Sequence, residues 1–144
     1  MKLLITSLIL IFLISCSPTP SENTNANAKA KLAEKNKETA TRNEMIRLVQ
    51  EAQKLEQEGR EMEFYRKSQI SIESGACAKA LEKKAAGIAE FQRKMEEMPE
   101  NYKSKLELIF ADLSKCFACE KKAIESCKKA RATINQVIKE VFPQ

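Results

Sequence analysis

The sequence of 144 residues contains no histidine and no tryptophan, and it has only three glycines and four prolines. Without histidine, the chain cannot form Ser–His or Cys–His nucleophile pairs, and it lacks the commonest general base near neutral pH. The same absence excludes histidine-containing zinc sets and haem attachment of the CxxCH type. Three glycines do not provide a phosphate-cradling loop. The sequence therefore predicts a protein that is not an enzyme and carries no metal and no cofactor.

What the sequence does contain favours helices. Alanine, glutamate, lysine, leucine and isoleucine dominate, and few turn residues remain for a β-fold. The 25 Lys and Arg and the 20 Asp and Glu are interspersed along the chain, as on a solvated helical surface. No basic run is interleaved with the aromatic residues that stack on bases. We therefore expect an all-α protein that does not bind nucleic acid.

The N-terminus has the layout of a secretory signal peptide, with one lysine, an apolar centre and small residues at the cut. The apolar run is shorter than the roughly 20 residues that a transmembrane helix needs. The sequence Leu13-Ile14-Ser15-Cys16 resembles the lipobox of bacterial lipoproteins. This resemblance covers about the first 20 residues. It implies that residues 1–15 are removed and that Cys16 is lipidated, which anchors the chain to a membrane.

The residues after Cys16 extend this interpretation. The residue that follows Cys16 is Ser17 and not aspartate, which resembles the outer-membrane sorting pattern of Gram-negative lipoproteins. This resemblance implies an exported protein that is anchored to the outer membrane and faces the periplasm. Residues 16–27 are polar and rich in Pro, Ser, Thr and Asn, so we expect a flexible tether. An ordinary secreted protein, cut nearby without lipid, is the alternative.

From residue 28 onward, apolar residues recur at helical spacing and predict helices at about 28–73, 76–98 and 100–141. Pro99 ends the second helix and opens the third. Gly59 keeps the phase of its stripe, so we expect one helix that packs closely there, the alternative being a C-cap that divides it. Short connections make neighbouring helices antiparallel. We expect an elongated three-helix antiparallel bundle with coiled-coil-like seams.

Four cysteines remain after Cys16, and an even number in an exported chain indicates disulfides. Along one unbroken helix, Cys127 lies about 16 Å from Cys116 and about 12 Å from Cys119, whereas a disulfide needs Cα atoms within roughly 7 Å. The hairpin expected at Pro99 places Cys77 opposite the part of the third helix that lies between Cys119 and Cys127. The predicted pairing is Cys77–Cys127 with Cys116–Cys119. One alternative is Cys77–Cys119, with Cys116 and Cys127 reduced or linking two molecules. The other is a break in the third helix, for which these distances do not hold.

Two further residue sets are candidates for partner binding. One is an apolar cluster too broad for a single seam, which either contacts a partner or a second copy or caps the bundle end: Met62, Phe64, Tyr65, Ile70 and Ile72. The other is a local excess of cations suited to an acidic partner or an anionic lipid: Lys121, Lys122, Lys128, Lys129 and Arg131.

These features favour a membrane-anchored envelope lipoprotein that acts as a non-catalytic protein-binding or structural helical module. Its expected partner is another envelope protein or a second copy, with no small-molecule substrate. One alternative is a thiol-redox protein that uses Cys116 and Cys119, whose CxxC spacing occurs in thiol oxidoreductases. Another alternative is an inhibitor or exclusion-type surface lipoprotein.

Overall fold

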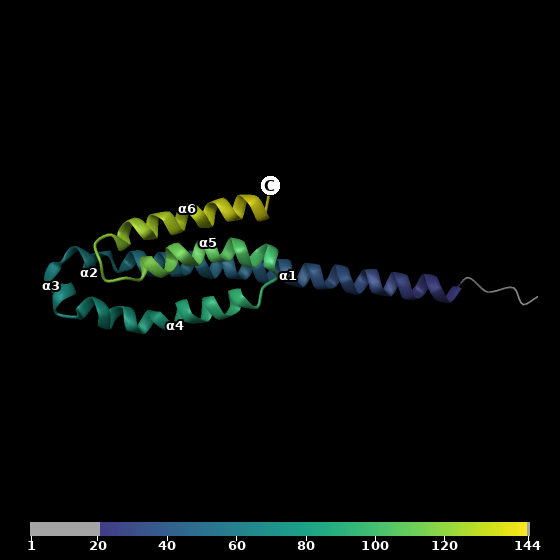
Figure 1. Cartoon of the computed structure of the whole chain (residues 1–144), viewed down its shortest axis with the longest axis horizontal. Helices are drawn as coiled ribbons and strands as arrows, with labels where there is room; N and C mark the ends of the chain where they lie inside the picture. Colours follow the sequence, from purple (N-terminus) through teal and green to yellow (C-terminus); the bar gives the residue numbers. More distant parts are fainter. Residues whose placement is uncertain (1–20, 144) are drawn as a thin grey trace, which may run out of the picture. The chain divides into compact units, whose positions relative to one another are not determined.

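The computed structural model describes residues 21–143, with side chains from residue 26 onward (Figure 1). All regular secondary structure in this range is α-helical, which confirms the predicted all-α class. The elements are α1 (Ser21–Glu61), α2 (Glu63–Lys67), α3 (Gln69–Glu73), α4 (Ala76–Glu96), α5 (Glu100–Cys116) and α6 (Ala123–Val141). The expected signal segment, residues 1–15, and the expected lipidation site, Cys16, lie outside the described residues.

The chain divides into two units, residues 1–36 and 37–144. In the first unit, the described residues form the N-terminal part of α1, and the side chains of residues 26–36 are exposed. The helix therefore includes residues 21–27, which the sequence predicts to be part of a flexible tether. Helix propagation fixes one residue for each hydrogen bond gained, so an established helix can extend into a polar segment that would not nucleate one.

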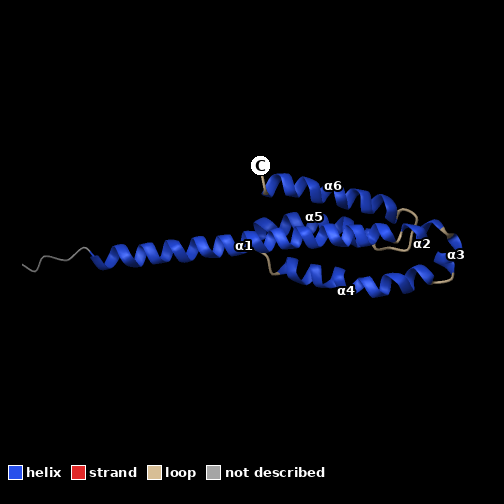
Figure 2. Cartoon of the chain, turned by 180° about the vertical axis from the view of Figure 1, so that it is seen from behind, coloured by secondary structure: helices blue, strands red, loops and turns tan. Residues whose placement is uncertain are grey.

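The second unit is built from four substantial helices, not the three predicted. They are residues 37–61 of α1 together with α4, α5 and α6, and successive long helices reverse direction (Figure 1, Figure 2). The segment expected as one helix over 28–73 ends its first part at Glu61 and continues as the short helices α2 and α3. The segment expected as one helix over 100–141 is divided into α5 and α6.

The break between α5 and α6 has no glycine or proline to signal it. After Cys116 the chain tightens, since Phe117 N donates to Ser114 O at 3.4 Å and Ala118 N donates to Lys115 O at 3.2 Å. Bonds over three residues are typical of a helix end. Residues 117–122 then turn the chain into α6, which packs beside α5.

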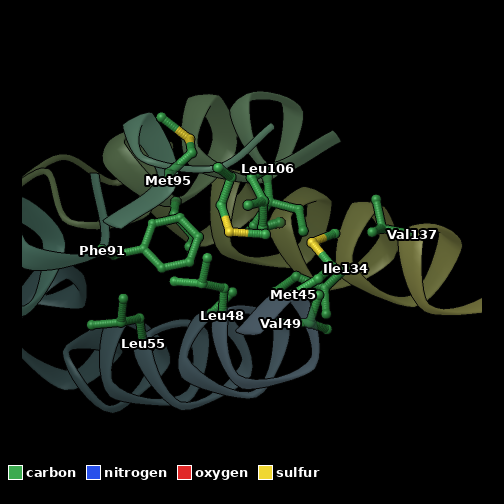
Figure 3. Packing of buried hydrophobic residues seen from close by; sticks show 14 residues of the cluster. Met45, Leu48, Val49, Leu55, Phe91, Met95, Leu106, Ile134 and Val137 are labelled. Atoms are coloured by element: carbon green, nitrogen blue, oxygen red, sulfur yellow. The ribbon is translucent and has the colours of Figure 1, made fainter. Parts of the chain in front are cut away.

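The main core lies between the four long helices (Figure 3). The α1 stripe that the sequence predicts is buried at Met45, Leu48, Ala52 and Leu55. Phe91, which is fully buried, stacks its ring on that of Phe110 with centroids 6.4 Å apart. The other labelled residues of the cluster in Figure 3 are Val49 from α1, Met95 from α4, Leu106 from α5, and Ile134 and Val137 from α6. Burial of these apolar side chains is the main force that holds the helices together.

A smaller apolar cluster lies where α2 and α4 meet the turn between α5 and α6. Met62, Cys77 and Leu81 are buried there, and Phe117 and Cys119 pack against them. We call α2, α3 and residues 117–122 the cross-linked end, because the two disulfides found among the described residues lie within or next to these segments.

Candidate functional site

Both disulfides lie at the cross-linked end. Cys77, at the start of α4, is bonded to Cys119 in the turn, and their Cα atoms are 5.9 Å apart. Cys116, the last residue of α5, is bonded to Cys127 of α6 with Cα atoms 4.6 Å apart. The predicted pairing of Cys77–Cys127 with Cys116–Cys119 is therefore wrong. The first alternative was right about Cys77–Cys119 and wrong about the other two cysteines, which are bonded to each other.

The error follows from the helix boundary. The 16 Å separation of Cys116 and Cys127 holds only along an unbroken helix. Because the chain turns at residues 117–122, the 11 residues between these cysteines form a hairpin instead of a straight rod. The turn thus makes possible the pairing that helix geometry had excluded.

The two cysteines of the CxxC sequence belong to different disulfides. Cys116 and Cys119 are not bonded to each other, as a redox-active CxxC pair would be in its oxidised form. Cys77, Cys116 and Cys127 are buried, and Cys119 is half-buried. Thiol–disulfide exchange requires an attacking thiolate to reach a sulfur, so the arrangement suits structural cross-links.

A buried arginine connects the same elements. Arg66 of α2 is fully buried, and its guanidinium donates to three backbone carbonyls. Its Nη1 donates to Gly59 O at 2.6 Å, its Nε donates to Ala118 O at 3.0 Å, and its Nη2 donates to Cys116 O. Nη1 also lies 3.8 Å from Cys127 Sγ. Sequence reasoning missed Arg66, because its neighbours Tyr65 and Lys67 give it the appearance of an ordinary surface charge.

The position of Arg66 explains how it is tolerated in the interior. Gly59 lies in the last turn of α1, and Cys116 ends α5. Unpaired carbonyls at helix C-termini carry partial negative charge, which favours a cation. Burial lowers the pKa of Arg66, and the Glu63 carboxylate acts in the opposite direction. An arginine remains charged in proteins, so Arg66 acts as a fixed cationic cap on two helices.

Gly59 packs closely against Cys116, the disulfide-bonded residue that ends α5. A Cβ atom at this position would collide with Cys116 Sγ and lie 3.3 Å from Phe117 Cε2. Gly59 lies inside α1, so the expected close packing there is confirmed. The expected single helix over 28–73 is wrong, because α1 ends two residues later at Glu61.

The structure separates the predicted apolar cluster into buried and exposed members. Met62 is buried in the small core and Ile72 is half-buried. Phe64 and Ile70 are each 77% exposed, and Tyr65 is 36% exposed. The rings of Phe64 and Tyr65 form an edge-to-face pair with centroids 5.8 Å apart. We call Phe64, Tyr65 and Ile70 the connector surface.

The predicted basic patch is largely neutralised by neighbouring carboxylates. Three of its members form ion pairs: Lys122 with Glu120 at 3.8 Å, Lys128 with Glu125 at 2.7 Å, and Arg131 with Glu56 at 3.2 Å. Lys121 and Lys129 are exposed. The five residues therefore do not present five uncompensated charges to one partner.

Three observations bear on location and chemistry. Two disulfides in one chain are typical of oxidising compartments and indicate an extracytoplasmic location. Within residues 21–143, no helix is long and apolar enough to cross a membrane. Over the same part of the chain, His, Cys, Asp and Glu side chains form no group of three or more that could hold a metal ion.

Comparison with protein-family models, curated proteins and solved structures found no match to this sequence.

Proposed function

We propose that the chain is a lipid-anchored protein of the bacterial cell envelope whose helical domain binds another envelope protein without catalysis. The observation that carries this proposal is the exposure of Phe64 on α2 and of Ile70 on α3, two short helices at the cross-linked end. Phe64 and Tyr65 pack their rings against each other at this surface, and contiguous exposed apolar side chains commonly mark a protein-binding site.

The support beneath the connector surface is what makes it suitable for binding. Arg66 lies in the same short helix as Phe64 and Tyr65, and its three hydrogen bonds tie α2 to the ends of α1 and α5. The Cys77–Cys119 disulfide fixes the start of α4, which follows α3. A surface that is already ordered loses less entropy on binding.

The size of the effect can be estimated from the exposed side chains. Fully burying one large apolar side chain stabilises a complex by about 1.5–3 kcal/mol. Removing both Phe64 and Ile70 from an interface should therefore weaken it by at least about tenfold, even after partial solvation is allowed for.

The binding proposal is tested by placing a photo-crosslinking residue at position 64 or 70 of the full chain in its native envelope. Leu108 of α5 is the matched control, because it is also a large apolar residue and is 62% exposed. We expect a protein adduct from positions 64 and 70 and none from position 108. The purified adduct partner should then bind the chain and lose affinity with Phe64→Ser/Ile70→Ser but keep it with Leu108→Ser. Equal losses of affinity in the double variant Phe64→Ser/Ile70→Ser and in Leu108→Ser would contradict the proposal. An adduct with a second copy of the chain would show self-association in place of an envelope partner.

The anchor and its location are tested separately. We propose lipidation at Cys16 and outer-membrane sorting through Ser17, on the resemblance of residues 13–17 to lipoprotein signals. A labelled fatty acid should enter the chain, and Cys16→Ser should abolish the label and release the protein from membranes. Ser17→Asp should redirect it to the inner membrane on density fractionation. Label that persists in Cys16→Ser would contradict the anchor.

A further inference from the structure

Glu56 is a charged residue in the interior, between α1 and α6. It is only 4% exposed. Arg60 Nε lies 2.7 Å from Glu56 Oε1, and Arg131 Nη2 lies 3.2 Å from the same oxygen. Arg60 is one turn further along α1, and Arg131 comes from α6. A buried carboxylate requires such pairing, so Glu56 holds one guanidinium from each helix in place.

The two guanidiniums border a cavity of about 370 Å³ between these helices. Polar side chains make up most of its lining, which consists of Gln53, Glu56, Gln57, Arg60, Arg131, Ile134 and Asn135. The side chains of Arg60 and Arg131 are 44% and 48% exposed. Each contacts Glu56 through one nitrogen, whereas a guanidinium carries five N–H donors. Most of their donors therefore remain accessible from the cavity side or from solvent.

The charges of the cavity favour an anion. Two cations and one carboxylate leave one net positive charge, and the amides of Gln53, Gln57 and Asn135 add neutral donors. Planar guanidinium groups bind carboxylates through two parallel hydrogen bonds. Because Glu56 already orients both arginines, a bound carboxylate would order few further side-chain bonds.

We propose that this cavity, the Arg60–Arg131 groove, binds the carboxylate groups of an acidic segment in a polypeptide partner. We assign the carboxylates to a polypeptide, because the proposed partner is a protein and the side chains of Arg60 and Arg131 are about half exposed, so the aspartate and glutamate side chains of a docked segment can reach them. The inference rests on the proposed binding function and adds the charge of the partner to it.

The test measures binding of a fluorescein-labelled oligoglutamate peptide by fluorescence anisotropy. It uses the full chain, purified from membranes in an uncharged detergent. We expect saturable binding that weakens as salt is added, and no comparable binding of an oligoglutamine peptide of the same length. Arg131→Gln leaves Arg60 paired with Glu56, so this variant should stay folded by circular dichroism while its affinity falls by about tenfold.

The controls separate this inference from general attraction to a cationic protein. Lys79→Gln removes an exposed cation of α4, outside the groove lining, and should leave the affinity within about twofold. Equal losses in Arg131→Gln and Lys79→Gln would overturn the inference, as would equal binding of both peptides or no binding to the unaltered chain. Phe64→Ser/Ile70→Ser should keep oligoglutamate binding, so failure of the groove and failure of the connector surface are distinguishable.

Discussion

Replacement of Arg66 by methionine gives the most direct test of how the cross-linked end is held together. Methionine has a long unbranched side chain that fills much of the same space but donates no hydrogen bonds. The substitution removes three bonds to backbone carbonyls at once. It leaves both disulfides in place, so it isolates the contribution of the guanidinium from that of the covalent links.

The expected cost follows from what each carbonyl retains. Gly59 O still accepts a hydrogen bond from Met62 N at 3.3 Å. No other N–H in the described residues donates to Cys116 O or Ala118 O. Leaving a buried acceptor such as Cys116 O unsatisfied costs about 1–3 kcal/mol, and the part-buried Ala118 O costs less because water can reach it, so the two oxygens together cost about 2–5 kcal/mol. Because the methionine chain is no longer charged, part of that loss is offset by the burial cost that Arg66 no longer incurs. We expect a net loss of about 3 kcal/mol in the free energy of unfolding.

Urea denaturation followed by circular dichroism, under oxidising conditions, measures this loss. Arg66→Lys is the graded comparison, since one ammonium group keeps the charge but cannot reproduce the planar fork of the guanidinium. Its free energy of unfolding should lie between those of the unaltered chain and Arg66→Met. Arg47→Met is the matched control, because Arg47 is an exposed arginine paired only with Glu44 among the ion pairs described. It should change stability by less than about 0.5 kcal/mol. Equal stability of Arg66→Met and Arg47→Met would refute the assigned role of Arg66.

Three further predictions concern the disulfides and the close packing beside them. Chymotrypsin cuts after Phe117, between Cys116 and Cys119, and trypsin cuts after Lys121 and Lys122, between Cys119 and Cys127. Non-reducing peptide mapping with both proteases should therefore recover Cys77–Cys119 and Cys116–Cys127 as separate linked peptides; a peptide that joins Cys77 to Cys127 would contradict the structure. Replacing Cys77 and Cys119 by serine should lower the free energy of unfolding by about 4 kcal/mol, and replacing Cys116 and Cys127 by about 3 kcal/mol, because the sequence separations of 42 and 11 residues set the loop-closure entropy. The reverse order in denaturation experiments would show that loop length does not control the effect. Gly59→Ala should destabilise by about 1–2 kcal/mol despite alanine's higher helix propensity, because its Cβ collides with Cys116 Sγ; the same substitution in the Cys116→Ser/Cys127→Ser background should cost less.

The apolar stripe of α1 illustrates what periodicity can predict. Met45, Leu48, Ala52 and Leu55 recur at helical spacing, and all four are buried. Burial of a helix face needs only that spacing and a neighbouring apolar surface. The close packing at Gly59 has the same basis, because the glycine does not change the phase of the stripe, but the phase gave no sign that α1 ends at Glu61.

The break at residues 117–122 illustrates where periodicity fails. The apolar positions of α5 and α6 continue the same phase across the turn, and no glycine or proline interrupts them. Their pattern is therefore equally consistent with one helix of about 40 residues. The prediction of the disulfides depended on that single helix, so the error in the boundary became an error in the pairing.

The connector surface was only partly visible in the sequence. The cluster from Met62 to Ile72 was recognised as too broad for one seam, but Met62 belongs to the core, whereas Phe64 and Ile70 are exposed. Arg66 gave no signal at all, although it is the residue that connects α2 to the other elements. A charged residue is expected to be exposed unless it has partners. Two of the partners of Arg66 are the backbone carbonyls of Cys116 and Ala118, which lie about 50 positions away in the sequence.

The sequence by itself determined the helical class, the positions of most of the core stripe, the lipobox resemblance and the even set of four cysteines. These properties depend on composition, on spacing within one helix or on a short local motif. Only the tertiary structure decided the four-helix arrangement, the disulfide partners, the burial of Arg66 and the pairing of Glu56 with two arginines. Each of these depends on which segments meet after the chain reverses at residues 117–122. That reversal is held by contacts between residues far apart in the sequence, and such contacts leave no periodic trace in it.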